Sequence, residues 1–357
     1  MKKTIMAATA LTFVAGSSIA GGIDRSGQGI NLLFEEGTVA QTSFARVDPN
    51  MTGTFGGTES GDMARAYNSP GLGFKMDLND SVGVALLYEQ PFGADVLYAP
   101  DYALSDPSNA DQAGGQADLH SLTALLRYKM QNGFSVYGGL RAQSLNVDIA
   151  LPAVPYSVES NTQTDLGYVV GAAWEKPEIA ARVALTYNSK IKHDLTVIDV
   201  VGGVTQPPSA ASVETPQSVN LDFQTGVAPN TLVFGTIRWA EWSKFSYAPP
   251  NYPRGTLLQF KNNSTTYSLG VGRRFSEAFS GAITVGYEKA NGDTVSDLGP
   301  ADGAKSIGLA GTYTRGNTKF SAGVRYVKLG DATTNAGARF TDNDGWVVGF
   351  QVTHKFN

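Results

Sequence analysis

The chain has 357 residues, a formal net charge of −5 and no cysteine. A disulfide-stapled scaffold is therefore excluded, and the charge provides no basic footprint for nucleic acid. Glycine (41 residues), tyrosine (15) and phenylalanine (17) are abundant, as is typical of β-barrels. After the N-terminal twenty residues, no apolar run reaches the roughly 18 residues of a membrane-spanning helix.

Residues 1–20, MKKTIMAATALTFVAGSSIA, have the pattern of a secretory signal peptide. Lys2 and Lys3 precede an apolar stretch, and small residues end it at Ser18 and Ala20. We expect cleavage before Gly21, so the mature chain leaves the cytoplasm.

Residues 21–39, GGIDRSGQGINLLFEEGTV, do not alternate between apolar and polar side chains. This glycine-rich stretch contains a short apolar patch formed by Ile30, Leu32, Leu33 and Phe34. We expect it to act as a hatch, a plug inside the barrel. A disordered periplasmic tail is the alternative.

Residues 40–357 alternate with a period of two, as strands do. Six short turns separate alternating segments, near residues 79–80, 131–133, 176–178, 228–230, 276–278 and 315–317. Seven longer polar segments alternate with them, near residues 56–66, 99–117, 150–160, 198–211, 246–262, 291–303 and 329–344. Thirteen connections join fourteen strands. The sequence therefore predicts an all-β fold, a transmembrane antiparallel β-barrel of about 14 strands.

The positions of charged side chains distinguish the inward face of these strands from the lipid-facing one. Arginine or lysine on a lipid-facing position costs about 2 to 4 kcal/mol at the midplane, so such residues should point inward. Eight basic residues lie opposite the apolar row of their strand: Arg127, Arg182, Lys190, Arg238, Arg274, Lys319, Arg325 and Lys355. A soluble sandwich would give the same parity, but the signal peptide and the loop rhythm favour a barrel in the bacterial outer membrane, surrounded by its lipid.

The third predicted strand is interrupted by Gln90, Pro91, Phe92 and Gly93. Proline lacks an N–H and glycine lacks a Cβ, so this stretch loses a ladder bond and permits a sharp bend. We expect a gap in the wall there. The alternative is a bulge near the outer end of the strand with no role in transport.

Four stretches carry a resemblance to a known family: SGQGINLLFEEGT, NDSVGVALLYEQPFGADVLY, ARVALTYNSKIKHDLT and TPQSVNLDFQTGVAPNTLVFGTIRWAEWSKF. In their order and spacing, the chain resembles the FadL-type outer-membrane transporters of long-chain fatty acids and other hydrophobic compounds. The resemblance covers nearly the whole mature chain. It implies a fourteen-stranded barrel with an N-terminal hatch, a hydrophobic ligand path and lateral release where residues 90–93 match the kink of the family's third strand.

A passive transporter of this kind needs residues that capture and hold its ligand. For a carboxylate head group, the inward cations are candidates: Arg182, Lys190, Arg238 and Arg274. Apolar residues of the 246–262 loop are candidates for capture: Tyr247, Tyr252, Leu257, Leu258 and Phe260. Lining of a solvated lumen and ordinary loop packing are the alternatives.

The chain departs from the family at the hatch. An Asn-Pro-Ala element usually precedes the first strand, and the segment from Gly37 to Phe44 lacks one. The later YNSPG, Tyr67 to Gly71, belongs to the second strand. The hatch looks shortened, so the gating step of the family does not transfer directly.

Other functions are less well supported by the residues. An enzyme is not expected, because the histidines, His120, His193 and His354, show no triad spacing. TDNDG, residues 341–345, lacks the rest of a calcium loop, so no metal or cofactor is expected. A general porin for polar solutes is the serious alternative. We expect a monomer, although the sequence does not fix the oligomeric state.

Overall fold

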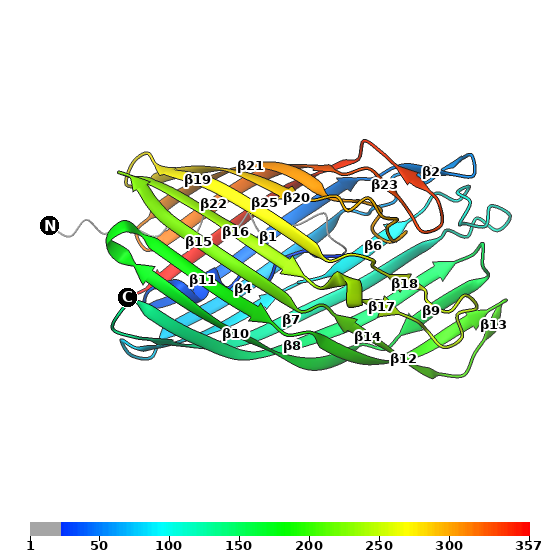
Figure 1. The fold of residues 1–357 in the computed structure, drawn as a ribbon, viewed down its shortest axis with the longest axis horizontal. Coiled ribbons are helices and arrows are strands. Elements are labelled where there is room, and N and C mark those ends of the chain that lie inside the picture. The colour runs from blue at the N-terminus through cyan, green and yellow to red at the C-terminus, as the bar shows by residue number, and fades with distance from the viewer. Residues whose placement is uncertain (1–22) are drawn as a thin grey trace.

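The computed structural model describes residues 23–357, so the predicted signal peptide and the first two hatch residues lie outside the described residues. The main element is one closed antiparallel sheet whose strands run obliquely along the barrel (Figure 1). Ten strand positions are single strands: β1 (Thr38–Asn50), β4 (Tyr67–Asp77), β7 (Gly114–Lys129), β8 (Phe134–Leu151), β16 (Thr231–Ala240), β19 (Ser264–Arg274), β20 (Phe279–Glu288), β21 (Ala304–Arg315), β22 (Thr318–Leu329) and β25 (Asp344–Phe356).

Four further positions are split into two consecutive strands. The pairs are β5 (Val82–Glu89) with β6 (Gly93–Leu97), β9 (Tyr156–Ser160) with β10 (Gln163–Lys176), β11 (Ala181–Asn188) with β12 (Ile191–Val201), and β14 (Ser209–Thr215) with β15 (Ser218–Ala228). The described chain thus forms a fourteen-stranded barrel, as the alternation predicted.

The first and last strands close the barrel. β1 pairs with β25 from Thr38↔Phe356 to Asn50↔Asp344, and on its other side with β4. Because every wall strand pairs with a neighbour on each side over at least part of its length, the sheet closes on itself and has no edge strand. Closure of this kind satisfies backbone polar groups that lipid cannot satisfy.

Short turns gather at one end of the barrel and long connections at the other (Figure 1). Two predicted long connections differ from expectation, because residues 156–160 form β9 and residues 198–201 belong to β12. β9 pairs with β12 and with the end of β8, which extends this side of the wall. Turn-forming residues adjoin both segments, Pro155 before residues 156–160 and Gly202 after residue 201, so the sequence assigns both segments to the connections.

The remaining long connections form small structures over the open end. β2 (Gly53–Phe55), β3 (Thr58–Glu59), β23 (Ala332–Thr333) and β24 (Arg339–Phe340) build a four-stranded sheet, β17 (Ser246–Tyr247) pairs with β18 (Leu258–Gln259), and β13 (Val204–Thr205) extends a hairpin with β12. Tyr98 and Tyr102 stack at 4.7 Å among the buried residues below the four-stranded sheet.

Along the wall strands, many large apolar side chains face outward and several arginines face inward. Leu309 and Val348 are 54% and 56% exposed, whereas Arg127 and Arg325 are 2% and 6% exposed. This is the inverse of a soluble protein, in which charged residues are the exposed ones. No helix among residues 23–357 is long and apolar enough to cross a membrane.

The prediction that Lys190 faces the inside of the barrel is wrong. Even-numbered residues of β11 face inward, including Arg182 and Asn188, but odd-numbered residues of β12 do, beginning with Ile191. The two residues between the strands shift the alternation by one, and such a shift exchanges the faces. Lys190 is consequently on the outside, with its side chain 57% exposed and paired with Glu214 at 3.0 Å.

An arginine scan of two valines tests the lipid-facing assignment. Val271 is 48% exposed on the wall strand β19, whereas Val204 is 62% exposed on the β12–β13 hairpin beyond the barrel wall. We expect Val271→Arg to reduce the free energy of unfolding from lipid vesicles by about 2 to 4 kcal/mol. Val204→Arg should change it by less than about 0.5 kcal/mol. Equal effects in a denaturant titration would contradict a lipid contact at Val271.

Candidate ligand path through the barrel

Residues 23–37, called here the N-terminal segment, lie inside the barrel. Their short 3-10 helix η2 (Asn31–Phe34) buries its apolar side chains against inward-facing residues of the wall. The predicted hatch residues are 2%, 4%, 0% and 8% exposed, in the order Ile30, Leu32, Leu33 and Phe34. The ring of Phe34 lies 4.6 Å and 4.5 Å from the guanidinium carbons of Arg127 and Arg182. Apolar and cation–π contacts therefore anchor this end of the segment.

A buried ion pair anchors the other end of the N-terminal segment. Arg238 Nε on β16 donates to Asp24 Oδ2 at 2.8 Å. Its Nη1 donates to Ser218 Oγ and Asn220 Oδ1, both at 2.9 Å, and its Nη2 donates to Gln28 Oε1 at 3.2 Å. The fork of donors on one guanidinium thus joins the segment to β15 and β16.

This anchor predicts a strong effect of Arg238→Met on the N-terminal segment. The change leaves Asp24 as a buried charge without its counter-ion, which costs about 3 to 5 kcal/mol. We expect the segment to leave the lumen far more often, so trypsin should cleave after Arg25 faster by roughly two orders of magnitude. Arg274→Met is the matched control, since Arg274 bonds Asn230 at the turn end of the wall. Equal cleavage rates would contradict the anchoring role.

The predicted kink lies between β5 and β6. Both strands pair with β7, through Glu89↔Ser121 and Gly93↔Asp118. Residues 90–92 of this strand therefore lie opposite residues 119–120 of β7, which makes a bulge of one extra residue. The bulge bonds to the N-terminal segment: Arg25 N–H donates to the Pro91 carbonyl at 2.8 Å, and Gly93 N–H donates to the Ile23 carbonyl at 2.9 Å.

The ladder between β4 and β5 is incomplete beside this bulge. It runs from Asp77↔Gly83 to Leu72↔Tyr88 and ends there, whereas the ladder between β4 and β1 continues to Tyr67. Among the described pairings, β4 residues 67–71 thus lack a continuous partner strand on the side of the bulge. Below this gap the outward side chain of Leu72 is 58% exposed, so an apolar surface borders it.

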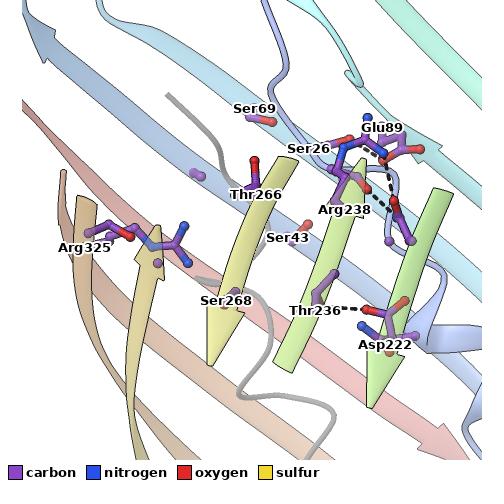
Figure 2. Close-up of a pocket in the computed structure, with 18 of the residues that line it drawn as sticks. Ser26, Ser43, Ser69, Glu89, Asp222, Thr236, Arg238, Thr266, Ser268 and Arg325 are labelled. Atoms are coloured by element: carbon purple, nitrogen blue, oxygen red, sulfur yellow. Dashed lines mark hydrogen bonds between the residues drawn. The ribbon is translucent and has the colours of Figure 1, made fainter. Parts of the chain in front are cut away.

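A cavity of about 250 Å³ extends from the N-terminal segment to the β4 side of the gap. Its lining includes Ser26, Ser43, Ser69, Glu89, Asp222, Thr236, Arg238, Thr266, Ser268, Glu288 and Arg325. Figure 2 shows hydroxyl and charged side chains of several strands directed toward this space. Thr236 donates to Asp222 at 2.7 Å and Thr266 donates to Glu288 at 2.8 Å. The central cavity is therefore of mixed character, because apolar side chains such as Leu32, Leu72 and Leu87 also line it.

A second, apolar pocket lies where the kink meets the 246–262 loop. Its lining includes Ile23, Phe92, Leu119, Leu145, Val147, Trp242, Tyr247 and Leu258. The rings of Phe92 and Trp242 meet edge to face at 5.3 Å. Its free space is about 30 Å³, roughly the volume of one water molecule, so a ligand needs side chains to move apart.

Two polar atoms of this apolar pocket have no hydrogen-bond partner among the described residues. They are Trp242 Nε1 and Tyr247 Oη, on side chains whose residues are 1% and 2% exposed. Burial in this loop also raises the pKa of the Tyr247 phenol, so the hydroxyl keeps its proton. Both polar atoms are buried in the packing around the pocket, whose own surface is apolar.

The structure separates the predicted head-group residues. Of the four, Arg238 lines the central cavity, Arg182 donates to Asn31 of the N-terminal segment at 2.7 Å, Arg274 lies at the turn end and Lys190 is outside. The five predicted capture residues do not form an exposed surface. Tyr247 and Leu258 are buried, and the others pack against the same apolar cluster: Tyr252, Leu257 and Phe260.

Trp242, Glu288 and Asp24 were not singled out from the sequence. Trp242 follows a strand and precedes the loop residues, and this neighbourhood is the one signal that would have identified it. The histidines have separate partners: His193 Nδ1 lies 3.0 Å from Asp165 Oδ2, and His120 Nδ1 lies 2.7 Å from Tyr88 Oη. Within residues 23–357, no group of three His, Cys, Asp or Glu side chains is arranged to hold a metal ion.

No protein-family model matches the chain, and no curated protein matches it by sequence. Solved structures match its fold. A Pseudomonas aeruginosa FadL homologue is 15% identical with a TM-score of 0.73, over 92% of each chain. The P. putida toluene transporter TodX is 12% identical with a TM-score of 0.68, over 92% of each chain. The Ralstonia pickettii toluene transporter TbuX is 12% identical with a TM-score of 0.64, over 96% of each chain.

Proposed function

We propose that this chain is a bacterial outer-membrane channel for the passive uptake of hydrophobic small molecules. Three features support the proposal: the closed barrel, its apolar outer surface and the N-terminal segment across its lumen. Structures with this fold include proteins described as toluene transporters and a monoaromatic hydrocarbon channel. No step of this function requires a catalytic residue, a metal or a cofactor.

The proposed path follows the cavities in order. A ligand enters the apolar pocket between Phe92, Trp242 and Tyr247, which accounts for the burial of the loop residues. It passes the junction of the N-terminal segment with the kink and reaches the central cavity. It leaves sideways between β4 and the bulge at residues 90–92. The observation that carries the proposal is the ladder that ends at Leu72↔Tyr88 beside a cavity lined by the same residues.

Lateral exit suits an apolar ligand for a thermodynamic reason. Passage through an aqueous exit would expose the ligand to water again, at about 0.8 kcal/mol for every CH₂ group. A path through the wall delivers it directly to the hydrocarbon of the membrane. The exposed Leu72 and Leu86 beside the gap supply a continuous apolar border.

A general porin for polar solutes is the second candidate, and the hydroxyl and charged side chains on part of the central cavity favour it. A porin requires an open aqueous lumen. The N-terminal segment crosses this lumen and is held there by Arg238, Arg182 and the kink. We therefore place the porin second.

One experiment separates the two functions. The purified barrel is titrated with a fluorescent long-chain fatty acid, competed by oleate and by toluene, and its conductance is recorded in planar bilayers. We expect saturable binding, competition and little conductance. Steady large conductance without saturable binding would contradict the hydrophobic channel and support a porin.

A further inference from the structure

Three cavities lie along the proposed path, and a layer of side chains separates the central cavity from the other two. A third cavity of about 70 Å³ shares Ile23, Ala94 and Leu298 with the apolar pocket, so these two spaces adjoin each other. Among residues 23–357, neither shares a lining residue with the central cavity. A ligand that leaves the apolar pocket must therefore pass this layer before it reaches the central cavity and the gap.

Arg25 belongs to this layer. Arg25 and Tyr67 line the third cavity, whereas Ser26 and Ser69, one and two residues further along the chain, line the central cavity. The border between the two cavities thus crosses the N-terminal segment at Arg25 and β4 at Tyr67. The guanidinium carbon of Arg25 lies 4.0 Å from the centre of the Tyr67 ring, which is a cation–π contact. This contact closes the border between the N-terminal segment and β4.

The same guanidinium reaches the opposite side of the gap, at Gly93. A Cβ atom on Gly93 would lie 2.6 Å from Nη1 and 2.7 Å from Nε of Arg25, so a larger residue there would displace the guanidinium. Gly93 pairs with Asp118, and residues directly opposite each other on two strands share one face of the sheet. Asp118 and Asp95 attract the positive charge on this face. Arg25 therefore spans the gap from the start of β4 to the start of β6.

The Arg25 side chain is held less firmly than the anchor at Arg238. Its Nε has no hydrogen-bond partner among the described residues, although Arg25 is only 6% exposed. The Arg238 guanidinium instead donates to four side chains, one of them Asp24. The backbone of Arg25 is fixed, because its N–H donates to the Pro91 carbonyl. The side chain can therefore rotate away while the N-terminal segment stays in the lumen.

We infer that Arg25 is the movable closure of the lateral gap. While its guanidinium lies between Tyr67 and Gly93, the apolar pocket and the third cavity are separated from the exit. When the side chain rotates out of this position, the ligand passes to the central cavity and the gap. Gly93 is required at the kink because a residue without a Cβ leaves room for the closed position. The inference rests on the proposed function and identifies the residue that controls the rate of its last step.

Arg25→Ala removes the closure, and we expect toluene uptake by cells that carry this variant to rise about tenfold. That factor corresponds to about 1.4 kcal/mol, the scale of a buried cation–π contact. Binding of the fluorescent fatty acid should not change, because the apolar pocket is intact. Conductance in planar bilayers should stay low, since the N-terminal segment remains in the lumen. Arg46→Ala is the matched control, because this exposed arginine bonds Asn68 of β4 and should not alter uptake.

Gly93→Ala is the second variant and tests the position of the guanidinium. The new Cβ displaces the Arg25 side chain, so uptake should rise as it does in Arg25→Ala. In the double variant the Cβ has no guanidinium to displace, and uptake should equal that of Arg25→Ala alone. Gel mobility before and after heating reports whether each barrel is folded.

The outcomes separate the closure from the transport function. Unchanged or slower uptake in a folded Arg25→Ala barrel, or additive effects of the two changes, would overturn the inference and leave the proposed function in place. A rise in conductance together with uptake would also overturn it, because the whole N-terminal segment would then have left the lumen. If the unmodified chain neither binds the fatty acid saturably nor takes up toluene, the proposed function is overturned as well.

Discussion

Deletion of Pro91 should reduce uptake of hydrophobic solutes at least tenfold while the barrel still folds. Three residues of the third strand stand opposite two of β7 between Glu89↔Ser121 and Gly93↔Asp118. Removal of one residue leaves two residues opposite two of β7, so the backbone ladder can continue through the kink. The exit then closes and a ligand must re-enter water, at about 0.8 kcal/mol per CH₂. About 1.4 kcal/mol already corresponds to a factor of ten.

Pro91→Ala is the matched control for this deletion. It keeps the extra residue, so the bulge and the gap should persist and uptake should stay near that of the unmodified chain. Uptake of toluene into cells that carry each variant provides the measurement, and gel mobility before and after heating reports the folded barrel. A folded deletion variant that transports at the original rate would show that the gap is not the exit.

Deletion of residues 23–37 should turn the barrel into a conducting channel. Barrels of eight strands are filled by side chains and those of sixteen or more enclose aqueous channels, so a fourteen-stranded wall has room that the N-terminal segment occupies. Without it, contacts to Arg238, Arg182 and the bulge at Pro91 are lost. We expect steady single-channel conductance at least about tenfold above that of the complete chain.

A deletion at the hairpin tip, residues 202–207, serves as the comparison. These residues lie on the β12–β13–β14 extension and Gly202 and Gly203 are exposed. Their removal should leave conductance unchanged. If both deletions conduct alike, or if the complete chain already conducts, the N-terminal segment does not close the lumen and the porin gains support.

The architecture was predictable because the alternation of apolar and polar side chains along each strand indicates a wall with one lipid-facing side. Leu309, Val348 and their neighbours must face lipid, so their period of two survives along each strand. The bulge was predictable because Pro91 and Gly93 interrupt that alternation with residues that cannot continue a ladder. The burial of Ile30 to Phe34 followed from an apolar patch in a segment that otherwise lacks strand pattern.

The site was less predictable, because its residues meet through the closure of the barrel. Asp24 and Arg238 are far apart in sequence, and no local pattern announces their ion pair. Lys190 was misplaced since two residues between β11 and β12 reverse the alternation without a proline or glycine to mark them. The unpaired donors of Trp242 and Tyr247 depend on which groups surround them, and only the packed structure shows that.

The most direct test of the proposed path is photolabelling along it. A toluene analogue that carries a diazirine is bound to the barrel in vesicles, activated by light, and its attachment sites are mapped by mass spectrometry. The account predicts competable labels at Phe92, Trp242 and Tyr247, and further labels beside the gap at Ser69 to Leu72 of β4. Labels confined to the outward lipid-facing residues, and not reduced by unlabelled toluene, would contradict passage through the barrel.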